Sequence, residues 1–235
     1  MNRNYTSAHK NFMGLAFEKA SQNLGSTNEN PSVGCIIVKD GAVISSGVTS
    51  IKGRPHAEVN ALNKNKNFYG SSMYVTLEPC VHYGKTSPCI KSILKKGIKK
   101  VYYPILDFDS RTRNKAKKIL QKNKIKVKIG TLRKNAIDFY KSYSLFKSKK
   151  SLPLIDIKVA ISKDYFSVNK NNKWITNQSS REKVHLLRSK YDCILSTYKT
   201  VNKDNSMLNC RVKGLEKRSP SRVIIDKNLK LKKKT

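Results

Sequence analysis

Four residues in two separate segments could together build a catalytic metal site. His56 and Glu58 stand two positions apart in the first segment, and Cys80 and Cys89 belong to the second. One imidazole and two thiolates suit zinc, and three protein ligands leave its fourth tetrahedral position open. Zinc lowers the pKa of a bound water toward about 7, and a neighbouring carboxylate can carry protons. We therefore expect His56, Cys80 and Cys89 to hold Zn²⁺ and Glu58 to be the catalytic proton shuttle.

The order of these residues is typical of zinc deaminases, in which an H-x-E segment precedes a P-C segment with a second cysteine. A single histidine or cysteine would more often be a helix cap or a buried thiol. A zinc-structured scaffold without catalysis stays an alternative, but structural zinc sites normally have four protein ligands. Cys35 lies within the apolar run 33–38, so we assign it to the core rather than to the metal.

The surrounding pattern predicts the elements that position these residues. A hairpin is expected around Lys39-Asp40-Gly41, since a short Gly-containing turn joins two apolar runs there. Predicted strands cover 33–38, 42–48, 72–77, 100–106 and 125–129, and predicted helices cover 5–24, 55–62, 88–96, 115–122 and 132–146. Strands that alternate with helices indicate a mixed sheet with helices on both faces, so we expect a three-layer α/β/α domain.

The pattern restarts after a basic, serine-containing run at 147–151 that is followed by Pro153. We therefore divide the chain into a first domain at 1–147, a linker at 148–152 and a second domain at 153–235. The second domain is predicted to contain strands at 154–161, 193–196 and 223–226 and a helix at 179–188. No internal repeat is apparent.

The chain is strongly basic, with 49 Lys and Arg against 15 Asp and Glu in 235 residues and a formal charge of +34. Such a charge could indicate a nucleic-acid partner. The lysines, however, outnumber the arginines and are scattered along the whole chain, as an AT-rich coding sequence would produce. We expect a solvated basic surface and no nucleic-acid partner; a basic deaminase acting on nucleic acid, or a non-catalytic binding protein, is the alternative.

Composition also bears on location. No apolar stretch approaches the roughly 18 residues that a membrane span requires, and the first ten residues lack the core of a secretory signal. Five cysteines with uneven spacing do not predict a disulfide framework. We expect a cytoplasmic protein that does not bind membranes.

The segments His56–Leu62 and Tyr74–Cys89 (YVTLEPCVHYGKTSPC) resemble the bifunctional riboflavin-biosynthesis deaminase/reductase family. The resemblance implies deamination of diaminohydroxyphosphoribosylaminopyrimidine, a small phosphoribosylated substrate, to 5-amino-6-(5-phosphoribosylamino)uracil. It implies that Asn30 binds the pyrimidine, and that His82 and Lys85 lie on a loop that reaches the ribose phosphate. Thr49 stands where the family usually has a substrate-binding histidine.

The second domain resembles the family's reductase, which has a dihydrofolate-reductase-like α/β fold, uses NADPH and reduces the ribosyl group. The resemblance assigns Ala160, Trp174, Thr200 and Asp204 to the cofactor and Arg188, Leu208 and Arg211 to the substrate. Because residues 153–235 are fewer than that domain needs, we expect a truncated reductase of doubtful activity. The family also implies a homo-oligomer.

Overall fold

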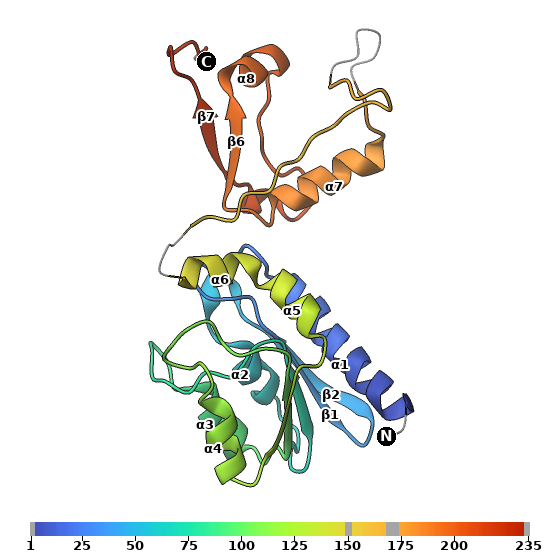
Figure 1. Ribbon diagram of the computed structural model, residues 1–235, viewed down its shortest axis with the longest axis vertical. Helices are drawn as coiled ribbons and strands as arrows, with labels where there is room; N and C mark the ends of the chain where they lie inside the picture. Colours follow the sequence, from blue (N-terminus) through green and yellow to red (C-terminus); the bar gives the residue numbers. More distant parts are fainter. Residues whose placement is uncertain (1–2, 149–151, 168–173, 233–235) are drawn as a thin grey trace. The chain divides into compact units, whose positions relative to one another are not determined.

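The computed structural model describes residues 3–148, 152–167 and 174–232. The chain divides into two compact units, Met1–Ile155 and Asp156–Thr235 (Figure 1). The division falls close to the expected start of the second domain at residue 153. Of the expected linker at 148–152, residues 149–151 lie outside the described part of the chain. The two units are described separately below.

Unit 1 is built on a five-stranded sheet with the strand order β2-β1-β3-β4-β5 (Figure 1). The central strand pair β1 and β3 is antiparallel, as are β1 and β2, whereas β3, β4 and β5 run parallel. This is the mixed sheet that the sequence predicts. The strands are β1 (Gly34–Lys39), β2 (Ala42–Val48), β3 (Ser72–Val75), β4 (Lys100–Tyr103) and β5 (Lys126–Ile129).

The predicted hairpin joins β1 to β2. Lys39 pairs with Ala42, so only Asp40 and Gly41 form the turn. Both have positive φ, 48° and 77°, which is the backbone that a two-residue type I′ turn requires. Aspartate and glycine tolerate that conformation, so the local sequence specifies the turn.

Helices cover both faces of the sheet. On one face, Met13 and Ala16 of α1 pack against alternate strand residues such as Tyr74 and Tyr102. The opposite face packs against α2, α3 and α4, and Cys35 is fully buried there, as expected of a core residue. The three-layer α/β/α prediction is confirmed. The helices are α1 (Arg3–Ser21), α2 (Ala57–Leu62), α3 (Cys89–Lys95) and α4 (Ala116–Lys122), and a short 3-10 turn, η1 (Ile51–Gly53), precedes α2.

The single helix predicted at 132–146 is two helices, α5 (Arg133–Phe139) and α6 (Lys141–Lys147). The break is at Tyr140, whose φ and ψ are −95° and 16°. Its buried hydroxyl hydrogen-bonds Thr76 Oγ1 at 2.5 Å and donates to the Ser32 carbonyl at 3.2 Å. These bonds tie the break to the end of the sheet, a long-range contact that periodicity does not reveal.

Unit 2 contains a two-stranded parallel sheet of β6 and β7 among the described residues. The predicted helix at 179–188 and strands at 193–196 and 223–226 are confirmed. The strand predicted at 154–161 is wrong, because these residues pair with no described strand, and Ile155 and Ile157 are 75% and 87% exposed. The elements are α7 (Gln178–Arg188), β6 (Cys193–Thr197), α8 (Tyr198–Asp204), η2 (Glu216–Arg218) and β7 (Ser221–Ile225).

None of the helices in the described residues combines the length and the apolar character needed to cross a bilayer.

Candidate active site

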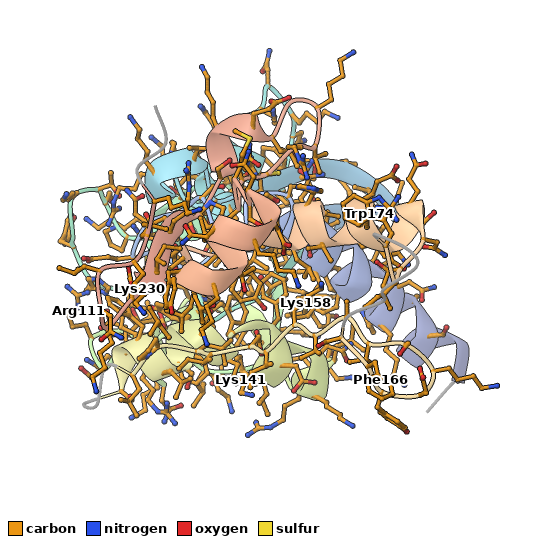
Figure 2. The ribbon with its side chains drawn as sticks, turned by 90° about the horizontal axis from the view of Figure 1, so that it is seen from above. Arg111, Lys141, Lys158, Phe166, Trp174 and Lys230 are labelled. Atoms are coloured by element: carbon orange, nitrogen blue, oxygen red, sulfur yellow. The ribbon has the colours of Figure 1, made fainter. Side chains whose placement is uncertain are left out.

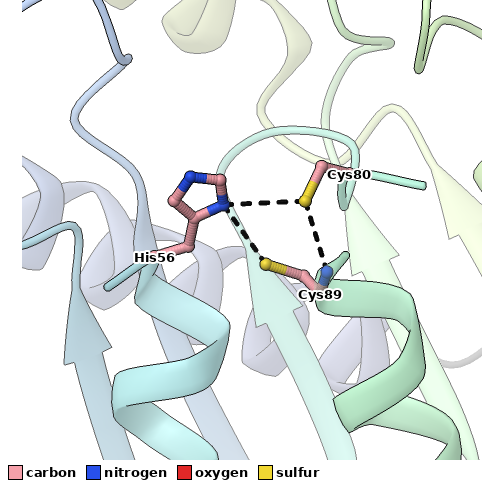
Figure 3. Close-up of side chains that lie close together, drawn as sticks. All are labelled: His56, Cys80 and Cys89. Atoms are coloured by element: carbon pink, nitrogen blue, oxygen red, sulfur yellow. Dashed lines mark hydrogen bonds between the residues drawn. The ribbon is translucent and has the colours of Figure 1, made fainter. Parts of the chain in front are cut away.

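The three predicted metal ligands converge (Figure 3). His56 Nδ1 lies 3.3 Å from Cys89 Sγ and 3.6 Å from Cys80 Sγ. The three ligand atoms all lie within 4.8 Å of one another. Among the described residues, these three form the one group of His, Cys, Asp or Glu side chains whose ligand atoms lie close enough together to hold a metal ion.

Three different elements supply these atoms. His56 occupies the N-cap position of α2, and Cys80 lies in the loop that follows β3. Cys89 is the first residue of α3, directly after Pro88 at the N-cap. The backbone N–H of Cys89 donates to Cys80 Sγ at 3.2 Å, which fixes the two sulfurs relative to each other. The fold thus brings Cys80 together with His56, which lies 24 positions before it, and with Cys89, which lies 9 positions after it.

The spacing fits a tetrahedral zinc ion. Zn–N and Zn–S bonds of about 2.1 and 2.3 Å at tetrahedral angles place the nitrogen and each sulfur about 3.6 Å apart. The observed separations of 3.3 and 3.6 Å are close to that value. Two sulfurs and one imidazole nitrogen are also the donor set that zinc accepts, so these residues could hold the ion.

Protonation in the cluster suits metal binding and proton transfer. Hydrogen bonds from Cys89, together with His56, lower the pKa of the Cys80 thiol to about 4, which makes Cys80 a thiolate at neutral pH. Glu58 is only 4% exposed, and burial raises the pKa of its carboxyl to about 7. A carboxyl with a pKa near the working pH can both take and return a proton.

A cavity of about 80 Å³ opens beside these residues. Asn30 and His82, which the sequence predicts to bind substrate, line it together with His56, Glu58 and Cys80. His82 Nδ1 is hydrogen-bonded to Thr112 Oγ1 at 3.0 Å. Lys85 lies on the exposed loop 82–86 and does not line this cavity.

Thr49 also lines the cavity, where the resemblance expects a histidine. It is 1% exposed, and its Oγ1 accepts a 2.9 Å hydrogen bond from the backbone N–H of Val33. The same hydroxyl lies 3.5 Å from the Val33 carbonyl. Because the hydroxyl of Thr49 is hydrogen-bonded to the backbone of Val33, it does not replace a histidine ring that faces a ligand.

The sequence analysis did not identify the residues of the cavity wall that lie in the loop after β4. Asp107, Asp109 and Arg111 lie in that loop, and Tyr143 and Lys147 of α6 face the same space. One signal was available, since acidic residues directly after a parallel strand lie at the sheet edge where ligands bind in open α/β folds. The contributions of α6 could not be found, because Tyr143 lies 36 positions from Asp107, whose Oδ1 its hydroxyl contacts, and periodicity does not reveal such long-range packing.

Buried Glu78 holds this wall in place. Its carboxylate accepts three backbone N–H groups, from Asp107, Asn114 and Ala116, each at 3.0 Å. Glu78 stands two residues before the predicted metal ligand Cys80. The loop that carries Cys80 and the loop that follows β4 are therefore joined by one side chain.

Unit 2 brings together some of its predicted residues. Ala160, Trp174, Arg188 and Arg211 line an open hollow of about 410 Å³. Trp174, which Figure 2 labels, is 56% exposed and carries the Arg181 guanidinium 4.6 Å from the centre of its ring. Thr200 and Asp204 of α8 and the buried Leu208 do not line this hollow.

Two family models match the chain. Residues 6–105 match the one described as the cytidine and deoxycytidylate deaminase zinc-binding region. Residues 153–235 match the RibD C-terminal domain. The first contains the whole cluster of predicted metal ligands, and the second contains the hollow of unit 2.

Curated relatives match across both regions. The chain is 35% identical to the riboflavin biosynthesis protein RibD of Aquifex aeolicus over 94% of its own length and 63% of the relative's. It is 37% identical to RibD of Bacillus amyloliquefaciens, over 93% of its own length and 59% of the relative's. The chain thus spans about three fifths of the length of these relatives.

Solved structures agree. The diaminohydroxyphosphoribosylaminopyrimidine deaminase/5-amino-6-(5-phosphoribosylamino)uracil reductase of Thermotoga maritima matches with a TM-score of 0.88 and 34% identity, covering 98% of this chain and 66% of that one. Acinetobacter baumannii RibD matches with a TM-score of 0.80 and 33% identity over 97% and 65%. The expected fold class, a deaminase-type domain followed by part of a RibD C-terminal domain, is confirmed. On the sequence, the ligand cluster and these matches, the chain belongs to the RibD family of riboflavin-biosynthesis proteins.

Proposed function

We propose that unit 1 is a zinc-dependent aminohydrolase that deaminates diaminohydroxyphosphoribosylaminopyrimidine in riboflavin biosynthesis. The observation that carries this proposal is the convergence of His56 Nδ1, Cys80 Sγ and Cys89 Sγ beside the buried carboxyl of Glu58. The Thermotoga relative bears the name of this deaminase, and the family membership supports the choice of substrate.

His56, Cys80 and Cys89 would hold the zinc ion. When bound, zinc would act as a Lewis acid that makes water a stronger acid at neutral pH. The carboxylate of Glu58 takes a proton from the attacking water and delivers it to the departing amino group, so that a C–O bond forms, the C–N bond breaks and ammonia leaves. A general acid–base residue of this kind typically contributes about 10²–10⁴-fold to the rate.

The residues of the cavity wall would bind the substrate. Asn30 and His82 line the cavity and are proposed to contact the pyrimidine and the ribose side of the substrate. Lys85 on loop 82–86 stays a prediction for the phosphate. Asp107 and Asp109, both on the wall, are further candidates for the ribose hydroxyls.

Glu58→Gln tests the proposal. The variant keeps the volume of the side chain but cannot carry a proton, so we expect zinc content equal to that of the unchanged chain and ammonia release at least about 100-fold slower. Elemental analysis and an ammonia assay on the purified, zinc-loaded chain measure the two quantities. Wild-type turnover in this variant would exclude Glu58 as the shuttle.

The same assay separates the alternatives. Single-stranded oligonucleotides, offered in place of the pyrimidine, should release no ammonia if the substrate is a small molecule. Release from oligonucleotides alone would favour the nucleic-acid deaminase. Zinc without release from either substrate would favour the non-catalytic scaffold.

For unit 2 we infer a reductase site that is only partly assembled. The hollow gathers the predicted cofactor residues Ala160 and Trp174 with the predicted substrate residues Arg188 and Arg211, and two guanidinium groups suit a phosphate-bearing ligand. The predicted residues that do not line the hollow are Thr200, Asp204 and Leu208. We therefore expect ammonia release without NADPH oxidation when both are followed in one coupled assay. Loss of NADPH absorbance that depends on the deaminated product would overturn this expectation.

A cytoplasmic location and a homo-oligomer remain predictions. Cysteines without disulfides are typical of a reducing compartment, and Cys80 and Cys89 form no disulfide among the described residues. Sedimentation of the purified chain would give its subunit number.

A further inference from the structure

The cavity of unit 1 is lined by the side chains of two arginines and one lysine, Arg54, Arg111 and Lys147. Two of them share one carboxylate. Arg111 holds Asp109 through Nε and Nη2 at 2.9 and 2.6 Å, and Lys147 Nζ lies 3.5 Å from the same residue. These two charges are therefore already partly compensated.

Arg54 is in a different position. In the described part of the chain, no carboxylate lies within ion-pair distance of its guanidinium, since the ion pairs found there both involve Asp109. Its Nη1 donates a hydrogen bond to Thr86 Oγ1. A guanidinium has five N–H donors in a planar fork, so most of them remain available to a ligand.

Arg54 lies two residues before His56 and close to the loop 82–86. The preceding Gly53 is buried with φ of 89°, and a Cβ there would come within 2.4 Å of Asn30 Nδ2, so this segment is seated against Asn30. Two residues after Arg54 comes the metal ligand His56. On the other side, a Cβ at Gly84 would lie 3.2 Å from Arg54 Nη2, which shows how closely the loop passes.

Lys85 differs in each of these respects. It is exposed on loop 82–86 and lies outside the cavity lining. A flexible lysine in water is strongly hydrated, whereas a half-buried arginine is more weakly hydrated and can form two parallel hydrogen bonds to a phosphate. The chemistry of the site thus favours Arg54 as the fixed cation for an anionic group.

We propose that Arg54 binds the phosphate of the phosphoribosylated substrate, with Thr86 orienting its guanidinium. The nature of that substrate rests on the proposed function. The pyrimidine then lies toward Glu58 and the phosphate toward the loop 82–86, so that Arg54 determines whether the enzyme accepts the nucleotide-like substrate or its dephosphorylated form.

Arg54→Gln tests this assignment in the full-length, zinc-loaded chain. We expect the KM for the phosphorylated substrate to rise roughly 10- to 100-fold, as for loss of one or two charge-assisted hydrogen bonds, with kcat little changed. The KM for the dephosphorylated riboside should not change. Lys91→Gln is the matched control, because Lys91 is a cation beside Tyr83 of the same loop but does not line the cavity.

Three kinetic outcomes would overturn the proposal. If Arg54→Gln impairs both substrates equally, the residue supports the metal-binding segment rather than the phosphate. If it impairs neither, or if only Lys85→Gln raises the KM for the phosphorylated substrate, the phosphate binds elsewhere.

Ribose 5-phosphate provides a readout that does not depend on deamination. Calorimetry should show binding to the unchanged chain and to Lys91→Gln, weakened at least about tenfold in Arg54→Gln. Equal affinity in all three, or no binding to the unchanged chain, would overturn the assignment. If ribose 5-phosphate binding depends on Arg54 but no ammonia is released from the pyrimidine, the proposed function fails and the anion site stands.

Discussion

Cys80 carries the largest share of the negative charge in the ligand cluster, because hydrogen bonds from Cys89 and His56 stabilise its thiolate. A serine hydroxyl in its place would not ionise at neutral pH, so Cys80→Ser should lose most of its zinc. The zinc-to-protein ratio from elemental analysis measures this directly. Cys193→Ser, at an exposed cysteine of β6 in unit 2, is the control and should keep full zinc. Full zinc in Cys80→Ser would mean that the cysteine is not a ligand.

Asp107 should make the stability of the protein depend on pH. It is 6% exposed, and burial raises the pKa of its carboxyl to about 6, above the ordinary value near 3.8. Between about pH 4 and pH 6 the folded state holds a proton that the unfolded state has lost, so the free energy of unfolding falls as pH rises through this window. Above pH 6 the carboxyl of Asp107 is ionised in both states, and the full cost of burying its charge lowers the free energy of unfolding.

Asp107→Asn should remove this dependence. The amide oxygen can still accept from the Asp109 N–H and the Tyr143 hydroxyl, as Oδ1 of Asp107 does at 3.0 and 3.3 Å. We expect the variant to match the unchanged chain near pH 4 and to exceed it by about 1–3 kcal/mol at pH 8. Urea denaturation at a series of pH values with constant zinc measures the difference. A variant that is less stable at pH 8 would contradict the argument.

At the scale of elements, Glu78 couples the metal-binding loop to the wall that follows β4. Glu78→Gln places an amide N–H₂ opposite one of three backbone N–H donors, so at least one hydrogen bond is lost and a donor is left unsatisfied. We expect the free energy of unfolding to fall by about 2 kcal/mol or more and the KM to rise more than kcat falls. Urea denaturation and steady-state kinetics check both.

The exposed Glu18 of α1 offers a matched control for this change. Glu18→Gln removes the same charge without touching a buried network and should change stability by less than about 0.5 kcal/mol. Equal effects of the two variants would show that net charge, and not the three hydrogen bonds, matters.

Short motifs beside strand and helix ends were predictable, and long-range packing was not. His56, Glu58, Cys80 and Cys89 could be found because each stands within a few residues of a predicted element. Tyr143 and Lys147 of α6 line the cavity, and α6 begins after the break at Tyr140, whose hydroxyl contacts Thr76, 64 positions away in the sequence.

The wrong strand at 154–161 has a related cause. Ile155, Ile157 and Val159 alternate with polar residues, which is typical of a strand with one buried face. A strand also needs a partner for its backbone hydrogen bonds, and periodicity says nothing of whether one is present. In the described chain these side chains lie exposed.

The chain carries a formal charge of +34, and the three lysines that Figure 2 labels, Lys141, Lys158 and Lys230, are all exposed. Only two ion pairs occur among the described residues, and both use Asp109. Most cations therefore have no nearby carboxylate, and their mutual repulsion should oppose folding. Added salt should weaken this repulsion, because the Debye length falls from about 30 Å at 0.01 M salt to about 10 Å at 0.1 M.

We therefore expect the midpoint of thermal unfolding to rise by at least about 4 °C between low salt and about 0.5 M NaCl, since each kcal/mol corresponds to about 2–4 °C for a chain of this size. Circular dichroism of the zinc-loaded chain measures the midpoint.

Screening depends on ionic strength alone, so KCl and NaCl should act alike. A rise caused by millimolar phosphate, but not by chloride at the same ionic strength, would show that anion binding at a site such as Arg54 stabilises the protein and that general repulsion does not limit it. An unchanged midpoint in every salt would mean that the positive charges are spread widely enough that their repulsion does not lower the stability of the folded state.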